Sequence, residues 1–146
     1  MVALNYQGIP QKRGTSKAGQ NIVTPNMRDD AGNSYKTVRI GEQTWMAENM
    51  RYEGNSLTCH ANTNKDSKFR ENYGCLYTWY DALKVCPAGW RLPTQEEFET
   101  LLQYVGSDIK EQSLNLRSAG WDNGKDAYGF GALPAGMCVQ KNYERF

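Results

Sequence analysis

Residues 86–102 have the sequence CPAGWRLPTQEEFETLL, which holds the strongest local structural signal in the chain. Thr94 and Glu97 have the S/T-x-x-E spacing of a capping box, in which each side chain accepts a hydrogen bond from the other residue's backbone N–H. The sequence therefore predicts a helix that begins after Thr94 and ends at Gly106, where a left-handed glycine can stop it. The apolar residues of this helix follow at i, i+3, i+4 and i+7: Phe98, Leu101, Leu102 and Val105.

A second, shorter helix is expected directly upstream, in the stretch LYTWYDALKV. Thr78 has the position and chemistry of an N-cap, and the proline after Cys86 ends the helix, because proline disfavours helical geometry in the residue before it. Between the two helices, Trp90 and Leu92 alternate as in a strand, and we expect both in the core. The predicted buried face of the shorter helix has apolar residues at i, i+4 and i+7: Leu76, Tyr80 and Leu83.

Two extended segments are expected further towards the N-terminus. Residues 35–40, YKTVRI, are β-branched, aromatic and alternating, which predicts a strand. Residues 43–49, QTWMAEN, continue as a second extended piece, with Trp45 and Met46 supplying core side chains. Residues 53–74 are polar, turn-rich and without a period, so they predict a long loop.

The composition fits one globular domain that binds neither nucleic acid nor membrane. The chain has 146 residues, enough for a single core, and its 17 basic and 16 acidic side chains give a net charge of +1. Such a balance produces no field that attracts nucleic acid or an anionic bilayer. No stretch approaches the roughly 20 apolar residues of a membrane helix, so no membrane insertion is predicted.

The beginning of the chain differs in composition from the remainder. Residues 1–28 hold basic but no acidic side chains, among many Gln, Asn, Gly, Ser and Thr. Because no aromatic residues are interleaved with the charges, this composition predicts a flexible basic leader or linker rather than a nucleic-acid-binding arm. The folded domain is therefore predicted over residues 29–146.

Cysteine usage indicates the compartment. The four cysteines lack the C-x-x-C spacing of a zinc site, and the only histidine is His60, so no metal is predicted. An even number of cysteines at wide spacing, in a chain rich in Tyr and Asn, favours disulfides and an extracellular or cell-surface setting. The N-terminus lacks the basic and apolar pattern of a signal peptide, so we expect that a leader has been removed.

Motifs for catalysis are absent from the sequence. His60 directly follows Cys59, and adjacent residues rarely form a Cys–His dyad. No nucleophile elbow, phosphate loop or H-E-x-x-H pattern occurs. The pair Glu96 and Glu97 is explained by helix capping, since carboxylates stabilise a helix N-terminus. We therefore expect no enzyme activity and no cofactor.

The stretch WDNGKDAYG contains several acidic, amide and aromatic side chains that could bind a ligand. Asp122, Asn123 and Asp126 could offer oxygen ligands to Ca²⁺, but Asp and Asn beside Gly are also ordinary turn residues, and the turn interpretation is favoured. Trp121 and Tyr128 could stack on a sugar ring, although core packing is the favoured interpretation of such aromatic residues.

Four sequence blocks in this order resemble the Fibrobacter succinogenes major paralogous domain family: YKTVRIGEQTWMAENM, GCLYTWYDAL, CPAGWRLPTQEEFETLLQYVG and DAYGFGALPAGM. The resemblance covers roughly residues 29 to 137. It implies a secreted or surface-attached protein with a C-type-lectin-like α+β fold, in which two helices pack on a small twisted antiparallel sheet. In that fold the W-x-L-P-T block leads into the second helix, so these residues are expected to have a structural role.

The chain departs from the family pattern in two places. Arg70 stands near an expected cysteine and Cys75 stands where arginine is usual, so we expect the loop disulfide of Cys59 to form with Cys75. That bond would close the long polar loop and stabilise the domain by about 3 kcal/mol. Family members also continue beyond ALPAG, through further strands, to a cysteine that would pair with Cys86. The sheet is therefore expected to be incomplete, with Cys86 free, paired with Cys138 or paired between chains.

These observations predict a non-catalytic extracellular or cell-surface module for adhesion, which binds a carbohydrate or a partner protein. An open sheet edge would also favour self-association. One alternative is an oxidase domain like the formylglycine-generating enzymes, which share the R-L-P-T block but need a late cysteine pair; another is a degenerate structural fragment without a ligand. The predicted binding residues are Trp121, Asp122, Asn123, Asp126 and Tyr128.

Overall fold

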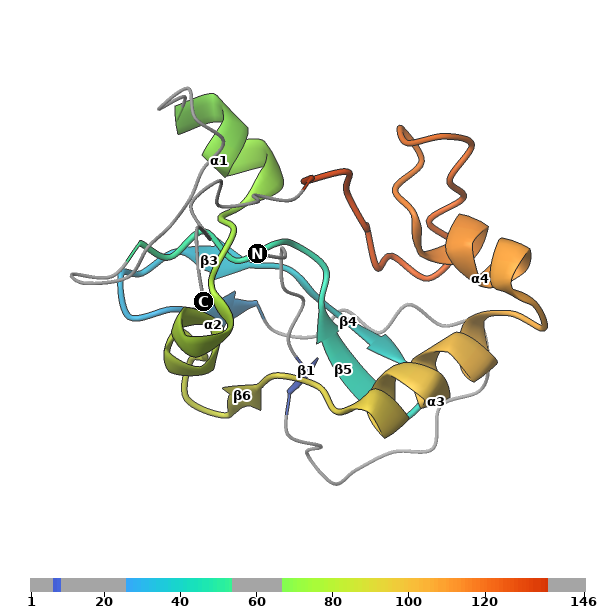
Figure 1. Ribbon diagram of the computed structural model, residues 1–146, viewed down its shortest axis with the longest axis horizontal. Helices are drawn as coiled ribbons and strands as arrows, with labels where there is room; N and C mark the ends of the chain where they lie inside the picture. Colours follow the sequence, from blue (N-terminus) through green and yellow to red (C-terminus); the bar gives the residue numbers. More distant parts are fainter. Residues whose placement is uncertain (1–6, 9–25, 54–66, 137–146) are drawn as a thin grey trace, which may run out of the picture.

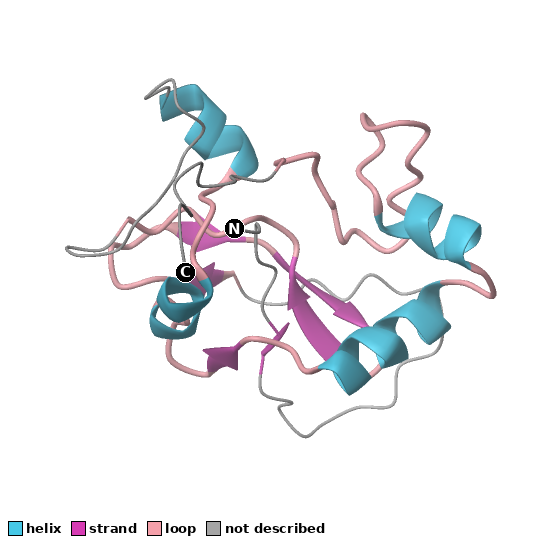
Figure 2. Ribbon diagram, viewed as in Figure 1, coloured by secondary structure: helices cyan, strands magenta, loops and turns pink. Residues whose placement is uncertain are grey.

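The computed structural model describes residues 7–8, 26–53 and 67–136 of the chain. Within that part the architecture is α+β, with short antiparallel strands and four helices, two more than predicted (Figure 1, Figure 2). The strands are β1 (Gln7–Gly8), β2 (Met27–Arg28), β3 (Ser34–Tyr35), β4 (Thr37–Ile40), β5 (Gln43–Met46) and β6 (Trp90–Arg91). The helices are α1 (Ser67–Tyr73), α2 (Trp79–Lys84), α3 (Gln95–Val105) and α4 (Ile109–Leu116).

The larger sheet has four strands in the order β4-β5-β1-β6. A separate two-stranded sheet is formed by β2 and β3. β4 and β5 form an antiparallel hairpin, with Thr37 opposite Met46 and Ile40 opposite Gln43. Gly41, in the hairpin turn, has a φ of +60°, a left-handed conformation that glycine adopts without steric cost. The two extended segments predicted from the sequence are therefore present, and they pair with each other.

The described parts of the predicted leader, residues 1–28, take part in both sheets. Gln7 of β1 pairs with Trp45 on one side and with Arg91 on the other, so β1 joins β5 to β6. β2 pairs with β3, and Met27 is only 5% exposed. Strand pairing in the described structure therefore begins ahead of the predicted domain boundary.

The hydrophobic core consists of two clusters, one on each side of the β4/β5 hairpin. Neighbouring residues of a strand face opposite sides of a sheet, so Trp45 and Met46 belong to different clusters. Trp90 and Leu92, predicted to lie in the core, are partly buried and pack against the sulfur-rich cluster. That cluster contains Met27, Tyr35, Met46, Met50, Cys75, Tyr77, Ala82 and Val85. The Trp45 cluster contains Val38, Ile40, Trp45, Leu101, Val105 and Phe130.

Helix α3 begins as predicted and packs against the Trp45 cluster. The Thr94 hydroxyl accepts from the Glu97 N–H at 3.3 Å and the Glu97 carboxylate accepts from the Thr94 N–H at 2.8 Å, so both halves of the capping box form. Leu101 and Val105 are each 1% exposed. The helix ends at Val105 with Gly106 as its C-cap, as predicted, but Gly106 is extended rather than left-handed. Glycine is needed there for space, since a Cβ would lie 2.8 Å from a backbone nitrogen of α4.

Helix α2 has the predicted N-cap but buries a different face. The Thr78 hydroxyl accepts from the Asp81 N–H at 3.2 Å, as expected for an N-cap. Asp81 is buried within the helix, whereas Tyr80 is 75% exposed and Leu83 is 53% exposed. The predicted face was counted from Leu76, which is buried but precedes the helix. The prediction of the buried face is therefore wrong.

Helix α1 lies inside the segment predicted to be a long loop. Arg70 of α1 forms an ion pair with Glu53, which follows the β4/β5 hairpin. The Cys75 N–H donates to the Met50 carbonyl at 2.7 Å just after the helix ends. These two contacts hold the residues that precede segment 54–66 against the residues that follow it.

Helix α4 is the second helix that the sequence analysis did not predict. Its N-cap is Asp108, whose carboxylate accepts from the Glu111 N–H at 2.9 Å. The Asn115 side chain donates to the Val105 carbonyl at 2.6 Å and thereby joins α4 to the end of α3. In the described part of the chain, no helix has the length and apolar character needed to cross a membrane.

Candidate functional site

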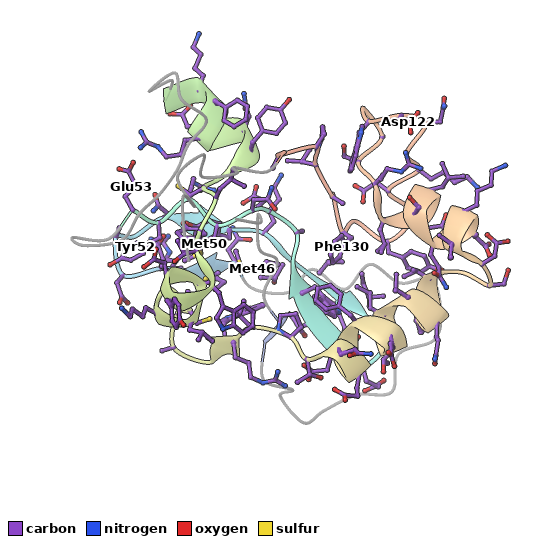
Figure 3. The ribbon with its side chains drawn as sticks, viewed as in Figure 1. Met46, Met50, Tyr52, Glu53, Asp122 and Phe130 are labelled. Carbon is purple, nitrogen blue, oxygen red and sulfur yellow. The ribbon has the colours of Figure 1, made fainter. Side chains whose placement is uncertain are left out.

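The five predicted binding residues lie on one loop, residues 117–132, which follows α4. The base of this 117–132 loop is closed by its own backbone, because Arg117 and Ala132 form a parallel bridge. The Ser118 N–H also donates to the Ala132 carbonyl at 2.9 Å. Figure 3 shows Asp122 at the outer end of the loop, away from the sheet. The loop is therefore a closed projection of the domain.

The inner part of the loop is anchored in the Trp45 cluster. Phe130 is 6% exposed, and its ring packs edge-on against the Trp45 ring with the centroids 6.0 Å apart. Tyr128 is partly buried and packs in the same way against Tyr104 of α3, at 5.9 Å. Tyr128 therefore anchors the loop to α3. This contact agrees with the packing role that the sequence favoured for Tyr128 over stacking on a sugar.

The outer end of the loop is a tight turn of type I′. The Gly124 N–H donates to the Trp121 carbonyl at 2.8 Å, and the two central residues, Asp122 and Asn123, have φ values of +45° and +59°. Asp and Asn are the non-glycine residues that tolerate this left-handed conformation best. A Cβ at Gly124 would lie 2.2 Å from the Ser118 carbonyl oxygen, so glycine is required there by close packing. The residues of the motif thus have the geometry that the turn interpretation expects.

Both carboxylates that could have bound Ca²⁺ have partners within the loop. The Asp126 carboxylate accepts from the Gly131 N–H at 2.8 Å, and Asp126 itself has a φ of +45°. The Asp122 carboxylate forms an ion pair with Arg117. Among the residues that the structure describes, no group of three or more His, Cys, Asp or Glu side chains could hold a metal ion. In the described structure, both carboxylates therefore hold the loop in its conformation.

Arg117 holds the exposed end of the loop against α4, and the sequence analysis missed it. Its guanidinium lies over the Trp121 ring, 5.6 Å from the centroid, within the range of a cation–π interaction. It also donates to the Asp122 carbonyl at 3.3 Å and to the Ser113 carbonyl of α4 at 3.3 Å. Trp121 stays partly exposed, whereas Asp122 and Asn123 are exposed. One arginine therefore orients the aromatic ring and the polar groups beside it.

A comparison with known protein families matches residues 38–146 to the Fibrobacter succinogenes major domain. The match covers well over half of the chain and includes β5, β4 apart from its first residue, all four described helices and the 117–132 loop. The chain belongs to this family. The resemblance inferred from the four sequence blocks is thereby confirmed. Comparisons with curated proteins and with solved structures found no match.

The W-R-L-P-T block of this Fibrobacter succinogenes major domain supports α3 beyond the capping box. Arg91 donates two hydrogen bonds to the Glu97 carboxylate, at 2.7 and 2.5 Å. The same carboxylate accepts from the Thr94 N–H. The hydrogen bonds from Arg91, and then the one from Thr94, hold the pKa of Glu97 below its usual range. The block therefore fixes the start of a helix, which is the structural role expected from the resemblance.

A buried polar cluster near β3 is also structural. Asp29 is 6% exposed, and its carboxylate accepts from the Ala31 and Asn33 N–H groups and from the Tyr35 hydroxyl at 2.7 Å. Burial, together with the hydrogen bond to Asp29, raises the pKa of Tyr35 above its usual value. The phenol therefore stays protonated as a donor to Asp29 across the physiological range of pH.

Two of the four cysteines, Cys75 and Cys86, lie within the described residues of this Fibrobacter succinogenes major domain. Cys75 is completely buried and takes part in a disulfide. Its predicted partner Cys59 lies outside the described residues, as do His60 and Cys138, so the pairing stays a prediction. The Cys86 thiol donates to the Ala82 carbonyl at 3.4 Å, at the end of α2.

Proposed function

We propose that this domain is a non-catalytic binding module on a C-type-lectin-like scaffold, which acts outside the cell or on its surface. Its ligand would be a carbohydrate, bound at the outer end of the 117–132 loop around Trp121. The observation that carries this proposal is the arrangement of Arg117, Trp121 and Asp122. A partly exposed indole is held in one orientation beside exposed hydrogen-bonding groups.

This arrangement suits a sugar because of the two kinds of surface that a pyranose presents. An aromatic ring covers the apolar face of the sugar, and neighbouring amide and carboxylate groups can bond to its hydroxyls. The turn around Asp122 and Asn123 is closed by backbone hydrogen bonds, so little conformational freedom is left to lose on binding. The carboxylates of the loop are already paired, which favours recognition over proton transfer.

The extracellular setting is supported by the cysteines. Cys75 takes part in a disulfide, and disulfides persist mainly in oxidising compartments. The near-neutral net charge and the aromatic-rich composition are also compatible with a module that meets an uncharged ligand.

The test is binding to an array of polysaccharides, with Trp121→Ala compared with Trp79→Ala. Trp79 is a matched control, because it is 65% exposed but lies on α2. We expect Trp121→Ala to lose at least about tenfold in affinity, as for an aromatic anchor, while Trp79→Ala binds as the parent does. Both variants should keep a cooperative thermal transition.

Three results would contradict the proposal. Unfolding of Trp121→Ala would show that the ring is a core residue. Loss of binding in Trp79→Ala alone would move the site to α2. Binding of no saccharide by the parent chain would leave a partner protein, the other ligand expected from the sequence, as the occupant of the loop.

A further inference from the structure

The outer turn of the 117–132 loop contains a chemically labile pair of residues. Asn123 is followed directly by Gly124, and this is the only Asn–Gly pair in the sequence. Glycine has no side chain to shield its backbone nitrogen, so that nitrogen can reach the side-chain carbonyl carbon of a preceding asparagine. Asn123 is exposed, and solvent can therefore reach the side chain.

The fold requires the glycine of this pair and favours the asparagine. Position 123 has a φ of +59°, which excludes most side chains other than Asn and Asp. At position 124 a Cβ would lie 2.2 Å from the Ser118 carbonyl oxygen and 2.7 Å from the Arg117 carbonyl oxygen, which leaves room only for glycine. The requirements of the turn thus place a reactive dipeptide at the outer end of the loop.

We propose that Asn123–Gly124 is a self-modification site, which the closed turn keeps unreactive and which converts once the turn opens. The Gly124 nitrogen attacks Cγ of Asn123 and forms a five-membered succinimide. The side-chain amide nitrogen leaves as ammonia and takes with it the proton of the Gly124 N–H. Water then opens the ring at either carbonyl and gives aspartate or isoaspartate. No oxidant, reductant or enzyme is needed.

The closed turn blocks the first step. The Gly124 N–H is engaged in the 2.8 Å hydrogen bond to the Trp121 carbonyl, so its proton is not free to leave. The peptide unit also packs closely against the carbonyls of Arg117 and Ser118, which prevents the rotation that brings the nitrogen to Cγ. Attack therefore requires local opening, and only the open fraction of molecules reacts.

The modification cannot be reversed by reclosing the turn. Isoaspartate routes the main chain through Cβ and lengthens the backbone where Gly124 has no spare room. Either product also adds a carboxylate next to Asp122. Arg117 already forms an ion pair with Asp122, so the new charge adds repulsion between the two carboxylates. Each opening event thus carries a chance of permanent loss of the loop geometry.

The experiment follows modification of the full chain at mildly alkaline pH, with and without urea. Ammonia release and mass spectrometry of the proteolytic fragment that contains the turn give the rate. We expect the native chain to react at least about tenfold more slowly than the chain in urea, because the turn is closed most of the time. Asn115, which is followed by leucine, serves as an internal control and should stay intact in urea.

The variant Asn123→Gly keeps the left-handed conformation and removes the amide, so it should fold normally and release no ammonia from this fragment. After removal of urea, chains that contain isoaspartate should show fast hydrogen exchange at the Gly124 amide, whereas unmodified chains should show protection. Equal rates with and without urea would overturn the protective role of the turn. Native protection at Gly124 in chains that contain isoaspartate would overturn the irreversible loss.

Discussion

Helices α2 and α3 begin in the same way but differ in the side chains that they bury. Each has a threonine N-cap whose hydroxyl accepts from the backbone N–H three residues further on, that of Asp81 in α2 and that of Glu97 in α3. In α3 the apolar side faces the core, and Leu101 is 1% exposed. In α2 the apolar Leu83 is 53% exposed, whereas the small Ala82 and the charged Asp81 are buried.

The comparison shows that a capping signal locates a helix without fixing which face it buries. Helix α3 runs for three turns, so the apolar side chains along it set its rotation. Helix α2 has only six residues, and it lies between residues that are themselves almost fully buried, Tyr77 and Val85. Its rotation follows from those neighbours. The Thr78 hydroxyl donates to the buried Asp81 carboxylate at 2.7 Å, which makes its burial tolerable.

The largest expected difference between the two helices is in their leucines. We expect Leu101→Ala to lower the free energy of unfolding by about 3 kcal/mol, since it opens a cavity in the Trp45 cluster. Leu83→Ala should change it by less than about 0.5 kcal/mol, because the side chain is largely exposed. Urea denaturation of both variants measures the difference. Similar losses would show that Leu83 is covered in solution.

The next largest effect is expected at the threonine N-caps, where the loss of stability should be greater for the shorter helix, α2. Thr94→Ala should cost about 1 kcal/mol, the usual value of an exposed N-cap. Thr78→Ala should cost about 2 kcal/mol, because it also removes a donor from the buried carboxylate of Asp81. Thermal melts of both variants test this order, with Thr78→Ser as the control that keeps the hydroxyl. A smaller loss in Thr78→Ala than in Thr94→Ala would refute the role given to Asp81.

The smallest expected effect is a pH dependence of the stability that Glu97 gives to α3. The pKa of Glu97 is lower in the folded chain than in the unfolded chain, chiefly because of Arg91. Its contribution is therefore fully present above the unfolded pKa of about 4.3 and is lost as pH falls through the folded pKa. Arg91 is 45% exposed, so we expect only about 0.5 kcal/mol. Arg91→Leu should lower stability at pH 7 and reduce the loss on acidification, as measured by urea denaturation between pH 7 and 3.

The elements that the sequence predicted are those whose signals are local. The capping box at Thr94 and the alternation of residues 35–40 act over a few residues, and both elements are found. Helix α4 also had a local signal, the Asp108 and Glu111 pair, and could have been predicted from it. The pairing of Gln7 with Trp45 and Arg91 could not, because no local pattern joins residues so far apart in the sequence.

In the candidate site, too, the features with local signals were predicted and those that depend on tertiary packing were not. Asp122, Asn123 and Gly124 form the expected turn because left-handed geometry is a property of those residue types. The anchoring of Tyr128 on Tyr104 depends on how α3 and the loop pack, and the role of Arg117 depends on the direction in which α4 ends. Those contacts follow from tertiary structure, so sequence patterns alone did not reveal them.

The contacts at the base of α1 also matter for protein engineering. The Glu53–Arg70 ion pair and the hydrogen bond from Cys75 to Met50 fasten the chain on both sides of segment 54–66. A foreign peptide grafted into that segment would start and finish at fixed points, and each doubling of its length would cost only about 0.6 kcal/mol of closure entropy. The domain can therefore serve as a display scaffold with the insertion placed between Glu53 and α1.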